Sequence, residues 1–165
     1  MRISLIRNVI APTRGTEKSA GIDFYVPNQL EGSTPFEIHY EEIPGQQVGK
    51  YYIELNPNQD VLIPSGVRAD IIPGYMWMAA DKSGVSTKQK LIVGAKIIDE
   101  DYQGEIGLHV INFGQKTTRI YLGQKLVQLI LVPVLYEDVE VVCDCEMHKT
   151  PTGRGDKGYG STGLH

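Results

Sequence analysis

Residues 105–134 read EIGLHVINFGQKTTRIYLGQKLVQLILVPV, in which runs of apolar and β-branched residues are separated by polar turns at Gly114 and Gly123. Short runs of this kind, broken by Gly, Pro and Asn, are typical of strands in an all-β sandwich or barrel. The pattern recurs along the chain, and helical periodicity is nearly absent. We predict a mostly antiparallel sheet, with strands at 3–6, 23–26, 51–55, 61–63, 66–71, 76–80, 92–95, 105–112, 119–122 and 125–134.

Three stretches depart from this strand pattern. Residues 83–90 are predicted to form one short helix, with Ser83 as a possible N-cap. Residues 30–50 are polar and rich in Gly and Pro, which indicates an inserted loop or an extra hairpin. Residues 150–163 contain five glycines and almost nothing apolar. Such a tail cannot build its own core, so it is either a disordered end or a flexible lid that orders on a ligand.

Length and composition limit the classes of protein to consider. At 165 residues and 41% hydrophobic content, one compact domain is expected. A formal charge of -4 argues against a nucleic-acid-binding face. The two cysteines, Cys143 and Cys145, are too few for a disulfide framework, and no apolar run approaches the length of a membrane span. We therefore expect a cytoplasmic protein without nucleic-acid or membrane partners.

Five segments, in this order, resemble the signature motifs of the trimeric dUTP diphosphatase (dUTPase) family. Each motif is weak by itself, but five in order are specific, and the resemblance spans residues 20–163 apart from the polar insertion. The segments are Ala20-Gly-Ile-Asp-Phe24, Lys82-Ser-Gly84, Ile98-Asp-Glu-Asp-Tyr-Gln-Gly104, Gly123-Gln-Lys-Leu-Val-Gln-Leu129 and Arg154-Gly-Asp-Lys-Gly-Tyr-Gly-Ser-Thr-Gly163.

The resemblance implies a fold, a reaction and an assembly. The fold would be an antiparallel, jelly-roll-like distorted barrel over residues 1–149, and residues 150–165 would be a lid over a neighbouring subunit's site. The reaction would be hydrolysis of dUTP to dUMP and pyrophosphate, with Mg²⁺ held mainly by the phosphates and water. The assembly would be a homotrimer in which each site draws on three subunits.

The resemblance also implies roles for individual residues. Asp99 would be the base that activates water, Ser83 would stabilise the leaving pyrophosphate, and Tyr102 would exclude a ribose 2'-hydroxyl, within a hairpin over residues 93–107 that forms the uracil pocket. Asp23 would organise the metal through water. The remaining substrate-binding residues would be Lys82, Gly84, Val93, Ile98, Gly107, Gln128, Arg154, Tyr159, Gly160, Ser161 and Thr162.

Several of these residues also have a simpler interpretation. The acidic run from Asp99 to Asp101 could be a solvated turn, Gln128 could make an ordinary cross-strand hydrogen bond, and Asp23 could lie in a surface turn. Lys82 stands where the family has arginine, and Lys96 stands where it has glycine. The Lys96 side chain could point outward, with only its backbone at the base pocket, or reach the nucleotide and alter base selectivity.

Other functions remain open at this stage. A dCTP deaminase, or a bifunctional deaminase and diphosphatase, shares the fold, although residues 83–87 do not resemble its helix segment. A catalytically idle nucleotide sensor would use residues 30–50 to bind a protein partner. A structural jelly-roll coat component would leave the five motifs unexplained.

Overall fold

The computed structural model describes residues 2–30, 34–147 and 150–158. The chain divides into two compact units, Met1–Leu135 and Tyr136–His165. This division lies fourteen residues before the sequence-based boundary between residues 149 and 150. Among the described residues, all strands belong to the first unit.

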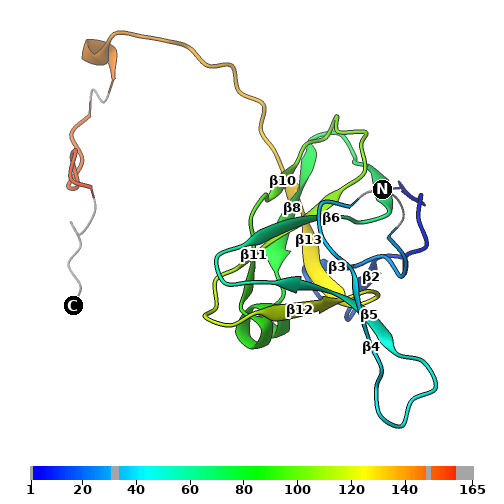
Figure 1. Cartoon of the computed structure of the whole chain (residues 1–165). Coiled ribbons are helices and arrows are strands. Elements are labelled where there is room, and N and C mark those ends of the chain that lie inside the picture. Colours follow the sequence, from blue (N-terminus) through cyan, green and yellow to red (C-terminus); the bar gives the residue numbers. More distant parts are fainter. Residues whose placement is uncertain (1, 31–33, 148–149, 159–165) are drawn as a thin grey trace. The chain divides into compact units, whose positions relative to one another are not determined.

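Antiparallel strands build the first unit, as the sequence predicts (Figure 1). One sheet has the order β10 (Ile97–Ile98), β8 (Tyr75–Asp81), β13 (Lys125–Pro133), β3 (Ile22–Tyr25) and β2 (Thr13–Arg14). A second has the order β6 (Asp60–Pro64), β11 (Gly107–Asn112) and β9 (Leu91–Val93). A third joins β12 (Thr118–Tyr121), β5 (Lys50–Leu55) and β4 (His39–Glu41), and β1 (Arg2–Leu5) pairs with β7 (Val67–Asp70).

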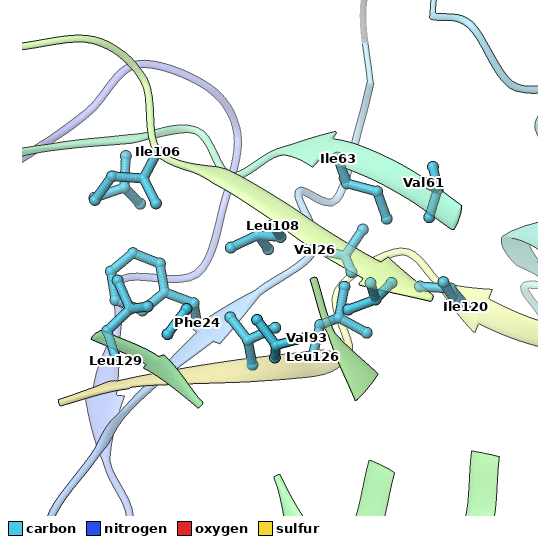
Figure 2. Close-up of a cluster of buried hydrophobic side chains, with 14 of the residues drawn as sticks. Phe24, Val26, Val61, Ile63, Val93, Ile106, Leu108, Ile120, Leu126 and Leu129 are labelled. Carbon is cyan, nitrogen blue, oxygen red and sulfur yellow. The ribbon is translucent and has the colours of Figure 1, made fainter. Parts of the chain in front are cut away.

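Alternation along the strands places the core. On β11, Leu108 and Val110 are buried, whereas His109 between them is only partly covered. Figure 2 shows the side chains of Leu108 and Leu126 among the clustered apolar groups. Phe24 and Trp77 meet edge to face, with ring centroids 5.4 Å apart. Each fully buried aliphatic or aromatic side chain contributes roughly 1.5–3 kcal/mol, so this cluster fixes which strand faces point inward.

The short helix forms close to its predicted position. It is a π-helical segment, η1 (Val85–Gln89), and it ends where Lys90 adopts a left-handed conformation with φ of 58°. The prediction that Ser83 caps this helix is wrong, because Gly84 occupies the cap position and makes no side-chain capping bond. The Lys82 carbonyl accepts the Ser86 N–H at 2.8 Å.

The strand boundaries differ from prediction where single contacts override the pattern. The strand expected at 105–112 begins only at Gly107, because the Glu105 side chain is held by Arg7 and by the Gly66 N–H. The very short strands β2 and β10 were not predicted, and β4 lies in the insertion for which a loop or an extra hairpin was expected. They are two or three residues long, and pairing with a neighbour rather than local sequence defines them.

The polar insertion contains an extra hairpin. Here β4 pairs with β5 from His39 opposite Tyr52 to Glu41 opposite Lys50, and the connecting loop projects away from the barrel in Figure 1. Arg119 on β12 anchors its base, because the guanidinium contacts Glu41 at 2.6 Å and lies 4.4 Å from the Tyr52 ring centroid.

The second unit is mostly extended. Its described part contains one 3₁₀ turn, η2 (Asp144–Glu146), with both cysteines as free, exposed thiols beside or within it. In the described parts of both units, no helix is long and apolar enough to cross a membrane.

Candidate active site

A cavity of about 260 Å³ opens beside the turn that follows β10. Four residues predicted to act on the substrate meet there, namely Ile98, Asp99, Tyr102 and Gly107. The other lining residues are Leu62, Ala95, Ile97, Glu105 and Ile106. A larger hollow of about 590 Å³, between residues 88–90 and 113–118, contains none of the predicted site residues.

The acidic run around this cavity separates into structural and available carboxylates. Glu100 accepts the Gly74 N–H at 2.7 Å and so ties the turn to the start of β8. Within the described residues, the Asp99 carboxylate has no hydrogen-bond or ion-pair partner. Asp99 is therefore the acid free to receive a proton from a bound water, whereas Glu100 holds the turn in place.

Glu105 lines the cavity but is committed to the fold. Its carboxylate receives two hydrogen bonds from Arg7, at 2.7 and 3.0 Å, and one from the Gly66 N–H at 2.7 Å. Burial by itself would raise the pKa of Glu105, but these hydrogen bonds and the Arg7 charge outweigh it and lower the pKa. With its oxygens engaged and its pKa lowered, the Glu105 carboxylate is a weak proton acceptor and a poor candidate for the base.

The Tyr102 ring is fixed across the mouth of the turn. Its hydroxyl donates to the Glu105 carbonyl at 2.8 Å, and its N–H donates to the Asp99 carbonyl at 3.2 Å. The ring lies so close to Gly104 that a β-carbon there would collide with it. A side chain at position 104 would displace the ring, which explains the glycine.

A second group of predicted residues gathers at the opposite end of β8. Asp23, which is 6% exposed, is paired with Lys82 through one carboxylate oxygen and with Lys125 through the other at 2.9 Å. Burial raises the pKa of Asp23, but the two lysines outweigh it and the net pKa is lowered. The alternative of a simple surface aspartate is wrong, because Asp23 is buried and bridges two cations. We call Asp23, Lys82 and Lys125 the Asp23 cluster.

Gln128 borders the Asp23 cluster. It lies opposite Asp23 on β3 and opposite Ala80 on β8, and its amide donates to the Asp81 carbonyl at 2.8 Å. A β-carbon at Gly21 would collide with the Gln128 side chain, so a glycine lets this amide lie against β3. Ser83 and Gly84, which directly follow Lys82 in the chain, are exposed.

The two groups do not meet within one chain. Ile98 pairs with Trp77, so Asp99 follows at the level of Met76, and Lys82 comes about six residues further along. At about 3.3 Å per strand residue, the two ends are about 20 Å apart. One chain therefore carries two separate parts of the predicted site.

Some predicted residues lie outside both groups. Val93 is buried in the core, and its N–H donates to the Asp81 carboxylate at 2.6 Å, so only its carbonyl remains for a ligand. Arg154 is in the second unit, where its guanidinium donates to the Lys157 carbonyl at 3.1 Å. Tyr159, Gly160, Ser161 and Thr162 lie outside the described residues.

Two contributors were missed by sequence reasoning. Lys125 lies in the Gly123–Leu129 motif and was given no role from the sequence, yet it pairs with Asp23. Ala95 lines the cavity and contributes its backbone N–H, but its methyl side chain carries no functional group, so nothing in the sequence singled it out. The Lys96 carbonyl accepts the Ala79 N–H at 2.7 Å and its side chain is exposed, so this lysine serves the fold through its backbone.

The sequence of this chain matches a known protein family and its members. A model of the dUTPase family matches residues 48–163. This chain belongs to the dUTPase family. A deoxyuridine 5'-triphosphate nucleotidohydrolase of Desulfotalea psychrophila is 38% identical over 112 residues, which are 67% of this chain and 72% of that protein. The mouse protein of the same name is 28% identical over 161 residues, which are 98% of this chain and 83% of its own length.

A solved dUTPase confirms the fold class. The structure of a mutant dUTPase of Staphylococcus bacteriophage 80alpha with dUpNHpp superimposes with a TM-score of 0.76. The match covers 99% of this chain and 98% of the phage chain at 21% identity, so it bears on the fold alone. The predicted antiparallel, jelly-roll-like β architecture with one short helix is therefore confirmed.

Proposed function

We propose that this protein hydrolyses dUTP to dUMP and pyrophosphate. Membership of the dUTPase family supports the proposal, as do the relatives named for this activity. The structural observation that carries it is the cavity beyond β10, where the Asp99 carboxylate, without a partner in the described part of the chain, lies beside the Tyr102 ring. These are the two groups that activation of a water and recognition of a nucleoside require.

In this proposal Asp99 is the general base. It accepts a proton from a water aligned with the α-phosphorus, and the water oxygen attacks in line as the bond to the pyrophosphate oxygen breaks. Glu100 and Tyr102 support this role, because their hydrogen bonds to Gly74 and to the Asp99 carbonyl hold the turn. General-base catalysis contributes typically about 10²–10⁴ to a rate.

Recognition of the nucleoside falls to the remaining cavity walls. The Tyr102 ring packs against the deoxyribose and leaves no room for a 2'-hydroxyl, and Ile98 and Gly107 complete the sugar and base pocket. Backbone groups of residues 93–107 read the uracil edge. The Val93 N–H already binds Asp81, so its carbonyl is the group that takes part.

The other end of β8 binds the phosphates. Ser83 hydrogen-bonds the oxygen between the α and β phosphates, with Gly84 allowing close approach, and Lys82 and Gln128 oppose the charge. Lys82 currently pairs with Asp23, and Lys125 can retain that carboxylate when Lys82 turns to a phosphate. A lysine supplies a point charge rather than the planar fork of arginine.

The assembly we propose is a homotrimer. The separation of Asp99 from Ser83, about 20 Å along β8, exceeds the span from sugar to phosphates in one nucleotide. A site that uses both must combine the cavity of one subunit with the Asp23 cluster of another, and a closed threefold ring provides such a contact three times. The tail of a third subunit then closes the site, with Arg154 and residues 160–162 over the phosphates and Tyr159 on the base.

Magnesium is the ion that the dUTPase family uses. The described residues contain no group of three or more His, Cys, Asp or Glu side chains that could hold a metal ion. We propose that the ion is carried mainly on the substrate phosphates and that Asp23 contacts it through a water. When bound, Mg²⁺ would neutralise phosphate charge.

Two further assignments complete the proposal. We place the protein in the cytoplasm, in keeping with a nucleotide substrate and with Cys143 and Cys145 as free thiols. We assign the β4–β5 hairpin, which projects from the barrel, as the surface for a protein partner (Figure 1).

A pyrophosphate-release assay tests the function. dUTP, UTP, dCTP and dTTP are each supplied with Mg²⁺ and with a chelator, and ammonia release is followed for dCTP. We expect pyrophosphate from dUTP alone, dependent on Mg²⁺. Ammonia from dCTP would instead indicate a deaminase, and tight dUTP binding without pyrophosphate would indicate a nucleotide sensor.

A further inference from the structure

The His109 side chain connects the segment that follows β9 with β6. It lies on β11 with its side chain 24% exposed, and its Nδ1 accepts the Ala95 N–H at 2.9 Å. The Nε2 atom lies 3.0 Å from a carboxylate oxygen of Asp60 on β6. Because Nδ1 accepts a hydrogen bond, the ring proton is on Nε2, which donates to Asp60.

The imidazole replaces strand pairing at this point. Strand β9 ends at Val93, and Gly94 still donates its N–H to the His109 carbonyl at 3.0 Å. Ala95 then leaves the ladder, and its N–H binds the imidazole instead of a strand neighbour. A β-carbon at Gly94 would collide with the ring, so the glycine permits this close contact.

This contact fixes one wall of the cavity. Ala95 lines the cavity together with Ile97 and Ile98. Its two neighbours in the chain are anchored separately, Gly94 to β11 and Lys96 to Ala79 on β8. The Ala95 N–H is thus the central attachment of the segment that passes from one sheet to the other.

Asp99 is held by different contacts. The pairing of Ile98 with Trp77 and the hydrogen bond from the Tyr102 N–H to the Asp99 carbonyl do not involve the imidazole. Loss of the His109 contact would therefore move the wall of the cavity while leaving the acid in place.

We propose that His109 is a positioning residue, which sets the wall at Ala95 and thereby the fit of the nucleoside in the cavity. The proposal rests on the function given above, because it assigns the cavity to the nucleoside. It predicts a change in substrate binding rather than in the chemical step.

Two substitutions separate the two hydrogen bonds of the ring. In His109→Asn the amide oxygen lies near the position of Nδ1 and can accept the Ala95 N–H. In His109→Gln the amide nitrogen can reach Asp60, but no acceptor remains near Ala95. Steady-state kinetics with dUTP, hydrogen exchange of the 91–98 segment and thermal unfolding are measured for both variants.

We expect His109→Gln to raise KM by about two- to tenfold, the range that loss of one hydrogen bond gives, with kcat within about twofold of wild type. Exchange at Ala95 should accelerate, and His109→Asn should resemble wild type in both measurements.

An unchanged KM in His109→Gln with faster exchange would overturn the positioning role, and so would a loss confined to kcat. Equal effects of Asn and Gln would overturn the assignment to Nδ1. A wild-type protein that releases no pyrophosphate would overturn the proposed function instead, and Kd for a non-hydrolysable dUTP analogue would then replace KM.

Discussion

The two ends of β8 differ in how their polar groups are satisfied. Beyond β10, Asp99 has no ion-pair or hydrogen-bond partner for its carboxylate among the described residues, and it lines a cavity with Ile98 and Tyr102. At the other end, the Asp23 carboxylate is shared between Lys82 and Lys125. A free acid suits proton transfer, whereas a cluster with surplus positive charge suits a polyanion. In the proposed function, chemistry and charge neutralisation are divided between the ends of one strand, and the proposed trimer brings them together.

Removing the free acid should have the largest effect. Asp99→Asn keeps the size of the side chain but cannot accept the proton, so kcat for dUTP should fall by about 10²–10⁴. Binding of a non-hydrolysable dUTP analogue, measured by calorimetry, should remain within a few-fold of wild type. Near-normal turnover would dispose of Asp99 as the base.

Mixing two inactive chains tests whether the ends of β8 serve different subunits. Ser83 is exposed, so the Ser83→Ala chain should fold normally. The Asp99→Asn and Ser83→Ala variants should each be nearly inactive alone. When Asp99→Asn and Ser83→Ala chains are refolded together in equal amounts, about a quarter of the sites should combine two intact parts and regain activity.

The matched control for this mixing is the double variant. Asp99→Asn chains refolded with chains that carry both substitutions contain no intact Asp99 and should stay inactive. If the first mixture also stays inactive although mixed assemblies form, the site is built within one chain.

The tail should affect the rate and not the fold. A chain that ends at Gly153 keeps the whole first unit, so its thermal midpoint should stay within a few degrees of wild type. Its kcat/KM should fall by about 10²-fold, the cost of poorly positioned reacting groups. An unchanged rate would contradict a closing role for residues 154–163.

The Asp23 cluster should give a smaller, pH-dependent effect on stability. The folded-state pKa of Asp23 is lowered, so its ion pairs stabilise the fold above the unfolded pKa of about 4 and lose this effect as pH falls below it. Asp23→Asn should therefore lower the free energy of unfolding at pH 7 by about 1.5–3 kcal/mol, the range for hydrogen bonds to a charged group. Urea unfolding at pH 7 and pH 3 should show the difference shrinking at the lower pH.

A control for the cluster is the ion pair of Arg2 with Asp70, in which both side chains are largely exposed. Asp70→Asn should change stability by less than about 1 kcal/mol at either pH, because exposed pairs contribute little. If both variants behave alike, burial of Asp23 does not strengthen its ion pairs.

By itself, the sequence determined the strand pattern, the short helix, the polar insertion and the motifs around Asp99 and Gln128. Alternation of apolar residues and turn residues are local properties, so they can be read along the chain. Only the tertiary structure decided which acids are structural. Glu100 binds Gly74 and Glu105 binds Arg7, across 26 and 98 residues of sequence, whereas the Asp99 carboxylate has no partner among the residues that the structure describes.

Tertiary structure likewise decided the pairing of Lys125 with Asp23 and the contact of His109 with Ala95. Both follow from strand register and from the point at which a ladder ends, and neither leaves a pattern in neighbouring residues. The tertiary structure also decided which residues lie at the two ends of β8. Distance along a strand is visible in the sequence, but which residues lie opposite its two ends is set by pairing between strands that are far apart in the chain.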